Sequence, residues 1–184
     1  MKKIMLSCAL FVFSNLALAH GPTRQQVEES IVINAPAADV WAMVGDFTGL
    51  HKWHPAVKTT EMKDDKTRLL TLGDGNTLTE KLIKLENDSM KLKYKIIDMT
   101  TIETFEFAGR QIKRQTLPVN TYSSTLKVEA EGDASKVTWK GKFYRAFLLN
   151  PPTPEGMSDK DAINAITGVY KGGLENLKTM LEKK

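Results

Sequence analysis

Cysteine is almost absent from this sequence. Its 184 residues include one cysteine, Cys8, which lies in an apolar segment at the start of the chain. If that segment is removed on export, as argued below, the remaining chain has no thiol. A disulfide, a thiolate zinc site and a cysteine nucleophile are then excluded. Stability must come from a hydrophobic core, which a chain of this length is able to build.

Three other features are missing. No apolar run after the first segment approaches the length of about 20 residues that a membrane span needs. No G-x-S-x-G motif marks a hydrolase nucleophile. Charge of one sign is also not in large excess, because 26 lysines and arginines stand against 22 acids, for a formal net charge of +4. This mild excess does not predict a nucleic-acid partner.

The chain starts with a leader. Lys2 and Lys3 precede an almost wholly apolar run over residues 4–18, and Ala17-Leu18-Ala19 closes it with small residues. This pattern is typical of a secretory signal peptide with an A-x-A cleavage site. We therefore expect cleavage after Ala19 and a single periplasmic domain of residues 20–184. The mature charge becomes +2, because 24 basic residues remain against 22 acids.

Strand and helix patterns follow the leader. Residues 27–34 alternate as a strand, and Asn34 is the expected N-cap of a short helix with Pro36 in its first turn. Residues 47–55 are expected to add one further helical turn. From residue 57 to 147 the apolar period is two, which predicts about six more strands in an antiparallel sheet with one wet face.

The last segment predicts a long helix. Ser158 is the expected N-cap, with Asp161 as its capping-box partner, and apolar residues then recur at helical spacing from Ala162 to Leu181. No other element is long enough to cover the buried face of the sheet. The sequence therefore predicts an α+β fold in which a curved antiparallel sheet wraps around a C-terminal helix.

Such an arrangement leaves space between the sheet and the helix at one end. Gly141 and Gly173 fall on the inner faces, where they either permit close packing, the commoner reason for an isolated glycine, or leave room for a ligand. The alternative for the inward aromatic residues is plain core. The residues expected to line a cavity are Trp41, Trp53, Tyr94, Tyr122, Trp139, Phe143, Tyr170 and Gly173.

Residues 27–36, together with Val40-Trp41, Gly45-Asp46-Phe47 and Trp53-His54-Pro55, resemble the SRPBCC superfamily of START-like and polyketide cyclase proteins. This resemblance implies the helix-grip fold. Within the superfamily, residues 20–23, 41–55, 70–80, 117–126, 139–145 and 167–170 are similar to the MxaD family. That similarity implies a periplasmic accessory protein that assists methanol dehydrogenase and its cytochrome c acceptor. Residues 100–115 depart from the family pattern and resemble an insertion.

Reactive side chains are few. His20 would become the new N-terminus, and with His51 or His54 it would form a copper-binding brace. The simpler interpretation is a cleavage junction and two exposed histidines, with no metal and no cofactor. Superfamily enzymes carry acid–base groups in the cavity, but here no triad or paired-carboxylate spacing connects the candidates. Ion pairs or exposed charges are the expected roles of Asp46, Glu80, Asp98, His54 and Arg145.

Alternating lysines suggest how a non-enzymatic protein would act. Their simplest explanation is that they form the solvated face of the sheet. The same face would also steer docking on an acidic redox partner. These residues are Lys91, Lys93, Lys95, Lys140 and Lys142. We therefore expect an accessory protein of methanol oxidation. The alternatives are a carrier of a small lipophilic ligand in the helix–sheet cavity and a cyclase- or hydrolase-like enzyme.

Overall fold

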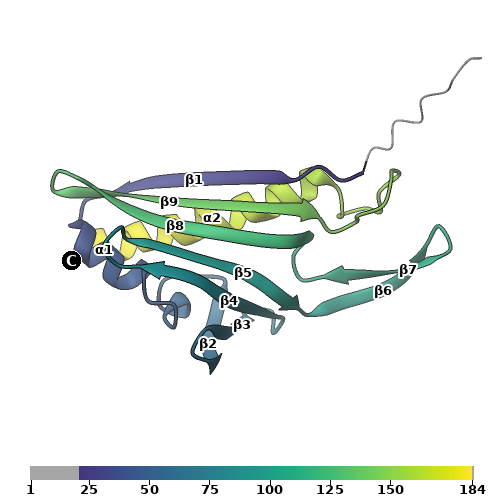
Figure 1. Cartoon of the computed structure of the whole chain (residues 1–184), viewed down its shortest axis with the longest axis horizontal. Coiled ribbons are helices and arrows are strands. Elements are labelled where there is room, and N and C mark those ends of the chain that lie inside the picture. The colour runs from purple at the N-terminus through teal and green to yellow at the C-terminus, as the bar shows by residue number, and fades with distance from the viewer. Residues whose placement is uncertain (1–20, 184) are drawn as a thin grey trace, which may run out of the picture.

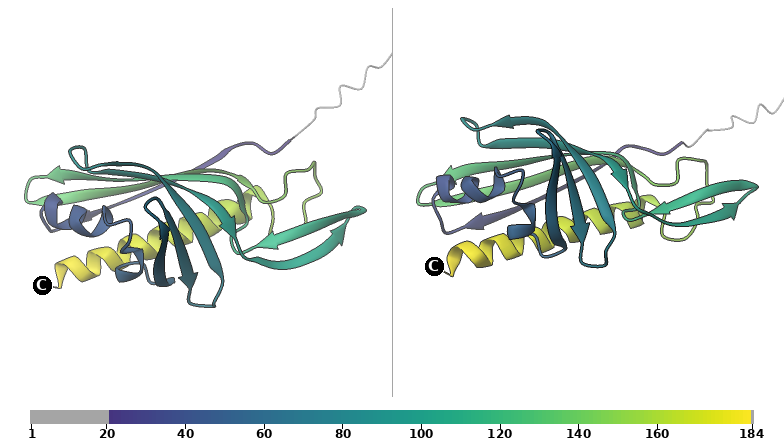
Figure 2. Two further views of the ribbon diagram at one scale, coloured as in Figure 1. Left: turned by 60° about the horizontal axis from the view of Figure 1, so that its bottom comes forward. Right: turned by 90° about the horizontal axis from the view of Figure 1, so that it is seen from below.

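The computed structural model describes residues 21–183. Seven antiparallel strands form one curved sheet in the order β1-β9-β8-β5-β4-β3-β2, and the long helix α2 (Asp159–Glu182) lies inside its curve (Figures 1 and 2). This confirms the predicted α+β fold. The sheet strands are β1 (Gln25–Ile33), β2 (Val57–Asp64), β3 (Thr67–Leu72), β4 (Thr77–Glu86), β5 (Lys91–Met99), β8 (Val119–Glu131) and β9 (Ala134–Arg145).

The two faces of the sheet differ in burial, as the alternation of apolar and polar residues predicts. On β9 the inward residues Val137, Trp139 and Phe143 are buried, whereas Lys140 and Lys142 lie on the outer face. Because side chains alternate along a strand, each inward residue is flanked by outward ones. The convex face is therefore wet, and the concave face supplies the core against α2.

Helix α2 begins with a capping box, as predicted. The Ser158 hydroxyl oxygen accepts from the Asp161 backbone N–H at 3.2 Å, and the Asp161 carboxylate accepts from the Ser158 N–H at 3.0 Å. These two bonds satisfy backbone donors that the first helical turn leaves free. The apolar stripe then packs against the sheet through Ala162, Ile166, Tyr170, Leu174, Leu177 and Leu181, all buried.

The predicted cap of the first helix was wrong. Helix α1 (Ala37–Val44) has Pro36 at its N-cap position, and no side chain caps it. Asn34 lies two residues earlier, and its backbone N–H instead donates to the Glu182 carboxylate at 2.8 Å. The further turn after α1 is present as the 3-10 helix η1 (Leu50–Lys52).

The predicted insertion forms a separate two-stranded hairpin, β6 (Thr101–Phe107) and β7 (Arg110–Gln115), which projects beyond the end of the main sheet (Figure 1). Ala108 and Gly109 make its two-residue turn, both with positive φ, as such tight hairpins require. Arg114 holds the hairpin to the molecule by donating to the Glu155 carbonyl oxygen at 2.9 Å. The hairpin leaves the sheet between β5 and β8.

A bulge in β8 lies next to that exit. The register between β8 and β9 shifts between Asn120 and Ser123, and Thr121 has a φ of 50°. A β-branched residue rarely adopts this conformation. The bulge precedes Tyr122, which is buried in the interior.

The predicted signal peptide, residues 1–19, and His20 lie outside the described residues. Among residues 21–183 no helix has both the length and the apolar character needed to cross a bilayer.

Candidate functional site

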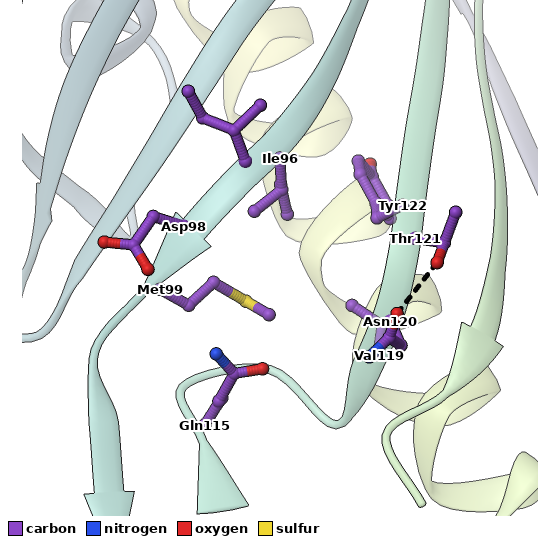
Figure 3. Close-up of a pocket in the computed structure, with 9 residues that line it drawn as sticks. Ile96, Asp98, Met99, Gln115, Val119, Asn120, Thr121 and Tyr122 are labelled. Atoms are coloured by element: carbon purple, nitrogen blue, oxygen red, sulfur yellow. Dashed lines mark hydrogen bonds between the residues drawn. The ribbon is translucent and has the colours of Figure 1, made fainter. Parts of the chain in front are cut away.

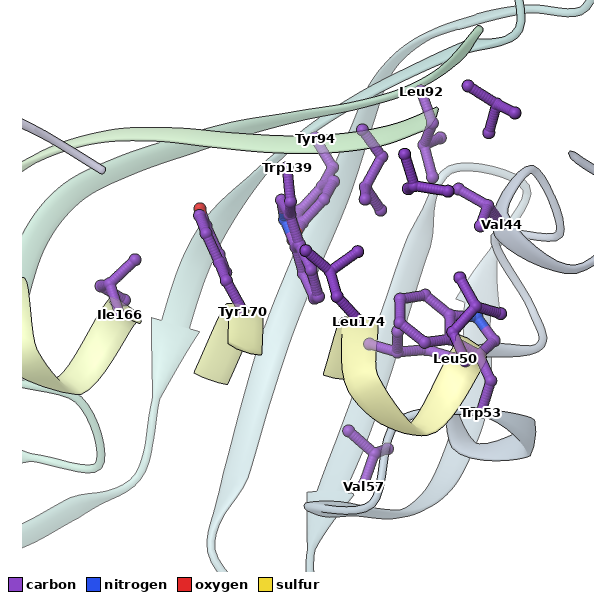
Figure 4. Packing of buried hydrophobic residues seen from close by; sticks show 14 of the residues in the cluster. Val44, Leu50, Trp53, Val57, Leu92, Tyr94, Trp139, Ile166, Tyr170 and Leu174 are labelled. Carbon is purple, nitrogen blue, oxygen red and sulfur yellow. The ribbon is translucent and has the colours of Figure 1, made fainter. Parts of the chain in front are cut away.

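An aromatic stack occupies the middle of the space between sheet and helix. Trp139 on β9 and Tyr170 on α2 lie parallel, with ring centroids 4.4 Å apart, and Trp53 packs against Trp139 at 5.6 Å (Figure 4). Gly173 permits this packing, because a Cβ there would lie 2.6 Å from His54 Cδ2 and 3.0 Å from Trp139 Cζ3. The volume in front of Gly173 is therefore filled by protein.

Hydroxyl groups connect the stack to the sheet. The hydroxyl oxygens of Tyr122 and Tyr170 are 2.6 Å apart, and Ser124 Oγ lies 3.1 Å from the Tyr170 hydroxyl. Gly141 makes room for this group, since a Cβ at that position would overlap the Tyr170 hydroxyl. Gly141 thus permits the close approach of Tyr170 to β9, and Gly173 permits the close approach of His54 and Trp139 to α2.

The hydroxyl groups of this network donate in one direction, from Tyr122 to Tyr170, then to Ser124 and to the backbone. Ser124 donates its single hydroxyl proton to the Lys140 carbonyl oxygen at 3.0 Å, so Ser124 Oγ can only accept from Tyr170. Tyr170 must then accept from Tyr122. Burial raises the pKa of both tyrosines well above the ordinary value, which keeps both protonated. The chain of donors ends at the backbone.

Tyr94 differs from the other tyrosines. Its hydroxyl oxygen accepts the indole N–H of Trp139 at 3.1 Å, and burial raises its pKa. The nearby hydroxyls of Tyr122 and Ser124 oppose that increase by hydrogen bonding to Tyr94. Tyr94 lies on the inner face of β5, on the wall of a cavity.

A buried ion pair faces the same cavity. Glu80 Oε2 accepts from Arg68 Nε at 2.8 Å and lies 2.6 Å from a terminal guanidinium nitrogen. Arg68 also donates to the Phe47 carbonyl oxygen at 2.6 Å and lies over the Phe47 ring. Burial raises the pKa of Glu80, and the charge of Arg68 opposes that increase. Both contacts use Oε2, so Oε1 has no donor among the described residues.

His54 is a buried structural histidine. Its Nε2–H donates to the Val169 carbonyl oxygen at 3.0 Å, and Nδ1 accepts from the Ala56 N–H at 3.2 Å. Burial lowers its pKa by more than the bond to Val169 raises it. The neutral ring therefore links the segment after η1 to α2.

The cavity itself is small and apolar. It encloses about 60 Å³, well below the roughly 300–1,000 Å³ of drug-sized ligand pockets. Glu80 is the one charged residue on its wall. The lining residues are Leu50, His54, Val57, Leu70, Leu72, Leu78, Glu80, Tyr94, Ile96, Leu117, Tyr122, Trp139, Ile166 and Val169.

A second, more polar pocket of about 200 Å³ adjoins the cavity where β5 and β8 separate (Figure 3). The pairing of these strands ends at Lys95 and Ser123, just before the hairpin leaves the sheet. Ile96 and Tyr122 line both spaces and form the wall between them. Asp98, Met99 and Gln115 lie on the solvent side.

The structure places the predicted cavity residues in three groups. Tyr94, Tyr122 and Trp139 line the cavity. Four others, Trp53, Phe143, Tyr170 and Gly173, are buried in the surrounding core. Trp41 differs from the expectation: it is only partly buried, does not line the cavity, and donates its indole N–H to Asn87.

The other reactive candidates have structural partners with one exception. Asp46 pairs with Lys52, and Arg145 with Asp159. Asp98 is exposed at the polar pocket. His51 is exposed, whereas both ring nitrogens of His54 are occupied, so the copper brace has no support from His54. Within residues 21–183 no group of side chains has the arrangement of a metal site.

Two residues of the site were missed from the sequence. Arg68 shares the face of Leu70 on β3, so its parity already placed a charge inward. Ser124 shares the inward face of Leu126 on β8. Alternation marked both positions as interior, but their partners come from other elements, and only the fold brings them together.

The outer face of the sheet carries the predicted lysines and several more. Cross-strand pairing places them on one surface, which we call the lysine face. Three pairs are directly opposite like charges: Lys81–Lys95, Lys84–Lys93 and Lys91–Lys127. The lysine face consists of Lys81, Lys84, Lys91, Lys93, Lys95, Lys127, Lys136, Lys140 and Lys142. Three of these lysines are ion-paired on the same face: Lys84 with Glu86, Lys127 with Glu129, and Lys140 with Glu28.

A curved sheet closed on a C-terminal helix, with a cavity between them, defines a helix-grip protein. The chain belongs to the family described as polyketide cyclase / dehydrase and lipid transport, whose model matches residues 24–182. This family membership confirms the coarser resemblance. A search of curated proteins found no match.

Solved structures agree with the family assignment. An uncharacterised protein from Bacillus thuringiensis is 25% identical with a TM-score of 0.69, over 86% of this chain and 99% of its own. XoxI from Bacillus cereus is 25% identical with a TM-score of 0.68, over 85% and 95%. The Zhui aromatase/cyclase from Streptomyces sp. R1128, at 15% identity and a TM-score of 0.60 over 88% and 95%, shares the fold.

Proposed function

We propose that this chain is an exported, non-enzymatic accessory protein that docks through its lysine face on an acidic protein partner. The leader, residues 1–19, supports export to the periplasm. The similarity to the MxaD family supports methanol oxidation as the context, with methanol dehydrogenase or its cytochrome c acceptor as the partner. The ionisable side chains of the interior, Arg68, Glu80 and His54, are ion-paired or hydrogen-bonded to protein groups, which supports docking over catalysis.

The observation that carries this proposal is the set of opposed lysines. Like charges directly opposite each other across antiparallel strands destabilise a sheet by a few tenths of a kcal/mol or more. Lys95 faces Lys81, and neither has an acidic partner among the described residues, whereas Lys93 faces Lys84, which also pairs with Glu86 at 2.7 Å. An anionic partner would neutralise this repulsion on docking, and its charge would also speed encounter.

Charge reversal separates docking from stability. The variant Lys93→Glu places opposite charges across β4 and β5, so we expect a small gain in stability, together with docking weakened about tenfold or more. The matched control Lys171→Glu reverses an exposed charge on α2 and should leave docking within twofold. The assay is binding of purified methanol dehydrogenase and its cytochrome at about 20 and 200 mM salt. If neither Lys93→Glu nor the higher salt concentration weakens binding, the proposal is contradicted.

A second proposal concerns the interior. We infer that the helix–sheet cavity holds a small lipophilic ligand, because its wall is almost wholly apolar and its roughly 60 Å³ volume is too small for a lipid. Dissolved xenon tests this by shifting methyl resonances on the cavity wall. Ile166 and Val169 should shift saturably, whereas Val32, exposed on the sheet, should not. Equal shifts at all three residues would contradict a specific cavity.

A further inference from the structure

The pairing of β4 with β5 contains two β-bulges, and each adds one isoleucine. The extra residue is Ile97 on β5 in the first bulge and Ile83 on β4 in the second. Both are exposed, with 48% and 47% of the residue surface accessible. The pairs that flank the two bulges are Thr79–Asp98 and Glu80–Ile96, and Leu82–Tyr94 and Lys84–Lys93. Because a bulge re-aims the side chains beside it, the backbone itself places these isoleucines on the surface.

The two isoleucines lie among lysines on the outer face of the sheet. On β5 the cavity-lining residues alternate with Lys95 and Ile97, and on β4 they alternate with Lys81 and Ile83. Lys81 and Lys95 are directly opposite each other. Each isoleucine lies two residues from this pair, so the two are about 13 Å apart along the strands at about 3.3 Å per residue. We call these four residues the isoleucine stripe.

The lysine pair at the centre of the stripe has its charge available for a partner. Neither Lys81 nor Lys95 lies within ion-pair distance of a carboxylate in residues 21–183, whereas three other lysines of the same face do. Asp98 follows Ile97 on the outer face and adds one negative charge at that end. The stripe is therefore positive at its centre and apolar on both sides of it, which is complementary to an acidic surface.

A folded protein fits this stripe better than a bilayer. Apolar side chains that bind a bilayer enter it by about 5–10 Å. A lysine side chain is longer than an isoleucine side chain, so the ammonium groups of Lys81 and Lys95 would meet a flat surface before Ile83 and Ile97 do. A protein surface has relief of its own, and its side chains are able to reach both the lysines and the isoleucines.

We propose that the isoleucine stripe is the centre of the docking surface, and that it fits a protein surface on which one or two carboxylates lie between two apolar side chains. This inference rests on the proposed docking through the lysine face. The lysines speed encounter, whereas burial of the isoleucines slows dissociation. Salt screens the first contribution and has little effect on the second.

Threonine substitutions test the stripe, because threonine keeps the β-branch that strands favour but replaces a hydrocarbon group by a hydroxyl. Ile83→Thr and Ile97→Thr should each weaken binding of purified methanol dehydrogenase or its cytochrome about fivefold, the value of burying the exposed half of one isoleucine. The loss should be equal at the two salt concentrations used above. Lys95→Gln should instead weaken binding mainly at low salt.

The matched control is Val32→Thr. Val32 is an exposed apolar residue on β1, at the edge of the sheet three strands away from β5, so this variant should bind within about twofold of the parent protein. Anionic phosphatidylglycerol vesicles provide the comparison with a lipid surface.

The outcomes separate the two proposals. If Lys93→Glu weakens docking but both isoleucine variants bind like the parent, or lose affinity only at low salt, the stripe is overturned and docking through the lysine face stands. If the parent binds the vesicles and both isoleucine variants reduce that binding, a lipid surface is the occupant and the stripe proposal is wrong. If the parent binds neither methanol dehydrogenase nor its cytochrome, both proposals fall together.

Discussion

Adjacent glycines in α2 provide a direct test of how tightly helix and sheet pack. Gly172 and Gly173 both lie in the interior of the helix, but their surroundings differ. A Cβ on Gly172 would meet nothing within 4 Å, whereas a Cβ on Gly173 would lie 2.6 Å from His54 and 3.0 Å from Trp139. The same substitution by alanine therefore samples open space at one residue and a closed contact at the next.

Gly172→Ala is expected to stabilise the protein, whereas Gly173→Ala is expected to leave stability unchanged or to lower it. Alanine in place of glycine stabilises a helix interior by about 1 kcal/mol, which is the whole effect at Gly172. At Gly173 overpacking adds a penalty of about 1–3 kcal/mol. The neighbours cannot move aside cheaply, because His54 is held by two hydrogen bonds and Trp139 by its stack on Tyr170. The two variants should therefore differ by about 1–3 kcal/mol.

Thermal unfolding measures this difference. For a domain of this size 1 kcal/mol corresponds to about 2–4 °C, so Gly172→Ala should melt roughly 2–12 °C above Gly173→Ala. Gly172→Ala should also melt above the parent protein. Equal melting temperatures for the two variants would refute the close contact at Gly173 and, with it, the argument that protein fills that space.

Three further perturbations test the interior and the bulge. Arg68→Met should destabilise the fold by about 3–5 kcal/mol in urea, because Glu80 is left buried and unpaired, and adding Glu80→Leu should restore much of the loss. His54 stays neutral in the fold while the unfolded chain takes up a proton below its ordinary pKa of 6.5, so stability should fall from pH 7 to pH 5; an unchanged melting temperature would contradict this. Thr121→Gly should stabilise by about 1 kcal/mol by relieving the positive φ, whereas Thr125→Gly, in regular β8, should destabilise.

Local patterns were sufficient for the elements that depend on local physics. The capping box at Ser158 and Asp161 follows from spacing and is confirmed. Alternation predicted the seven strands of the main sheet, but not the hairpin strands β6 and β7. The cap at Asn34 failed, because Pro36 takes that position and the Asn34 N–H is used by α2 instead. A cap competes with tertiary partners that a sequence pattern does not show.

The site depended on contacts between distant elements. Tyr94, Tyr122 and Trp139 were expected inside from their parity, and they line the cavity. Trp41 shares a helical face with buried Val40, yet it turns to Asn87. The sequence does not identify the partner of Arg68. Only the pairing of β3 with β4 places Glu80 opposite it.

The sequence by itself determined which residues face inward, where the long helix begins, and that lysines gather on the outer face, because these follow from periods of two and 3.6 residues. The tertiary structure decided how the interior is used. Sheet curvature and the close approach at Gly141 and Gly173 set the small volume of the cavity. Strand register set the opposition of Lys84 and Lys93, and the pairing of Arg68 with Glu80, since cross-strand neighbours are far apart in the chain and only the folded sheet assigns them.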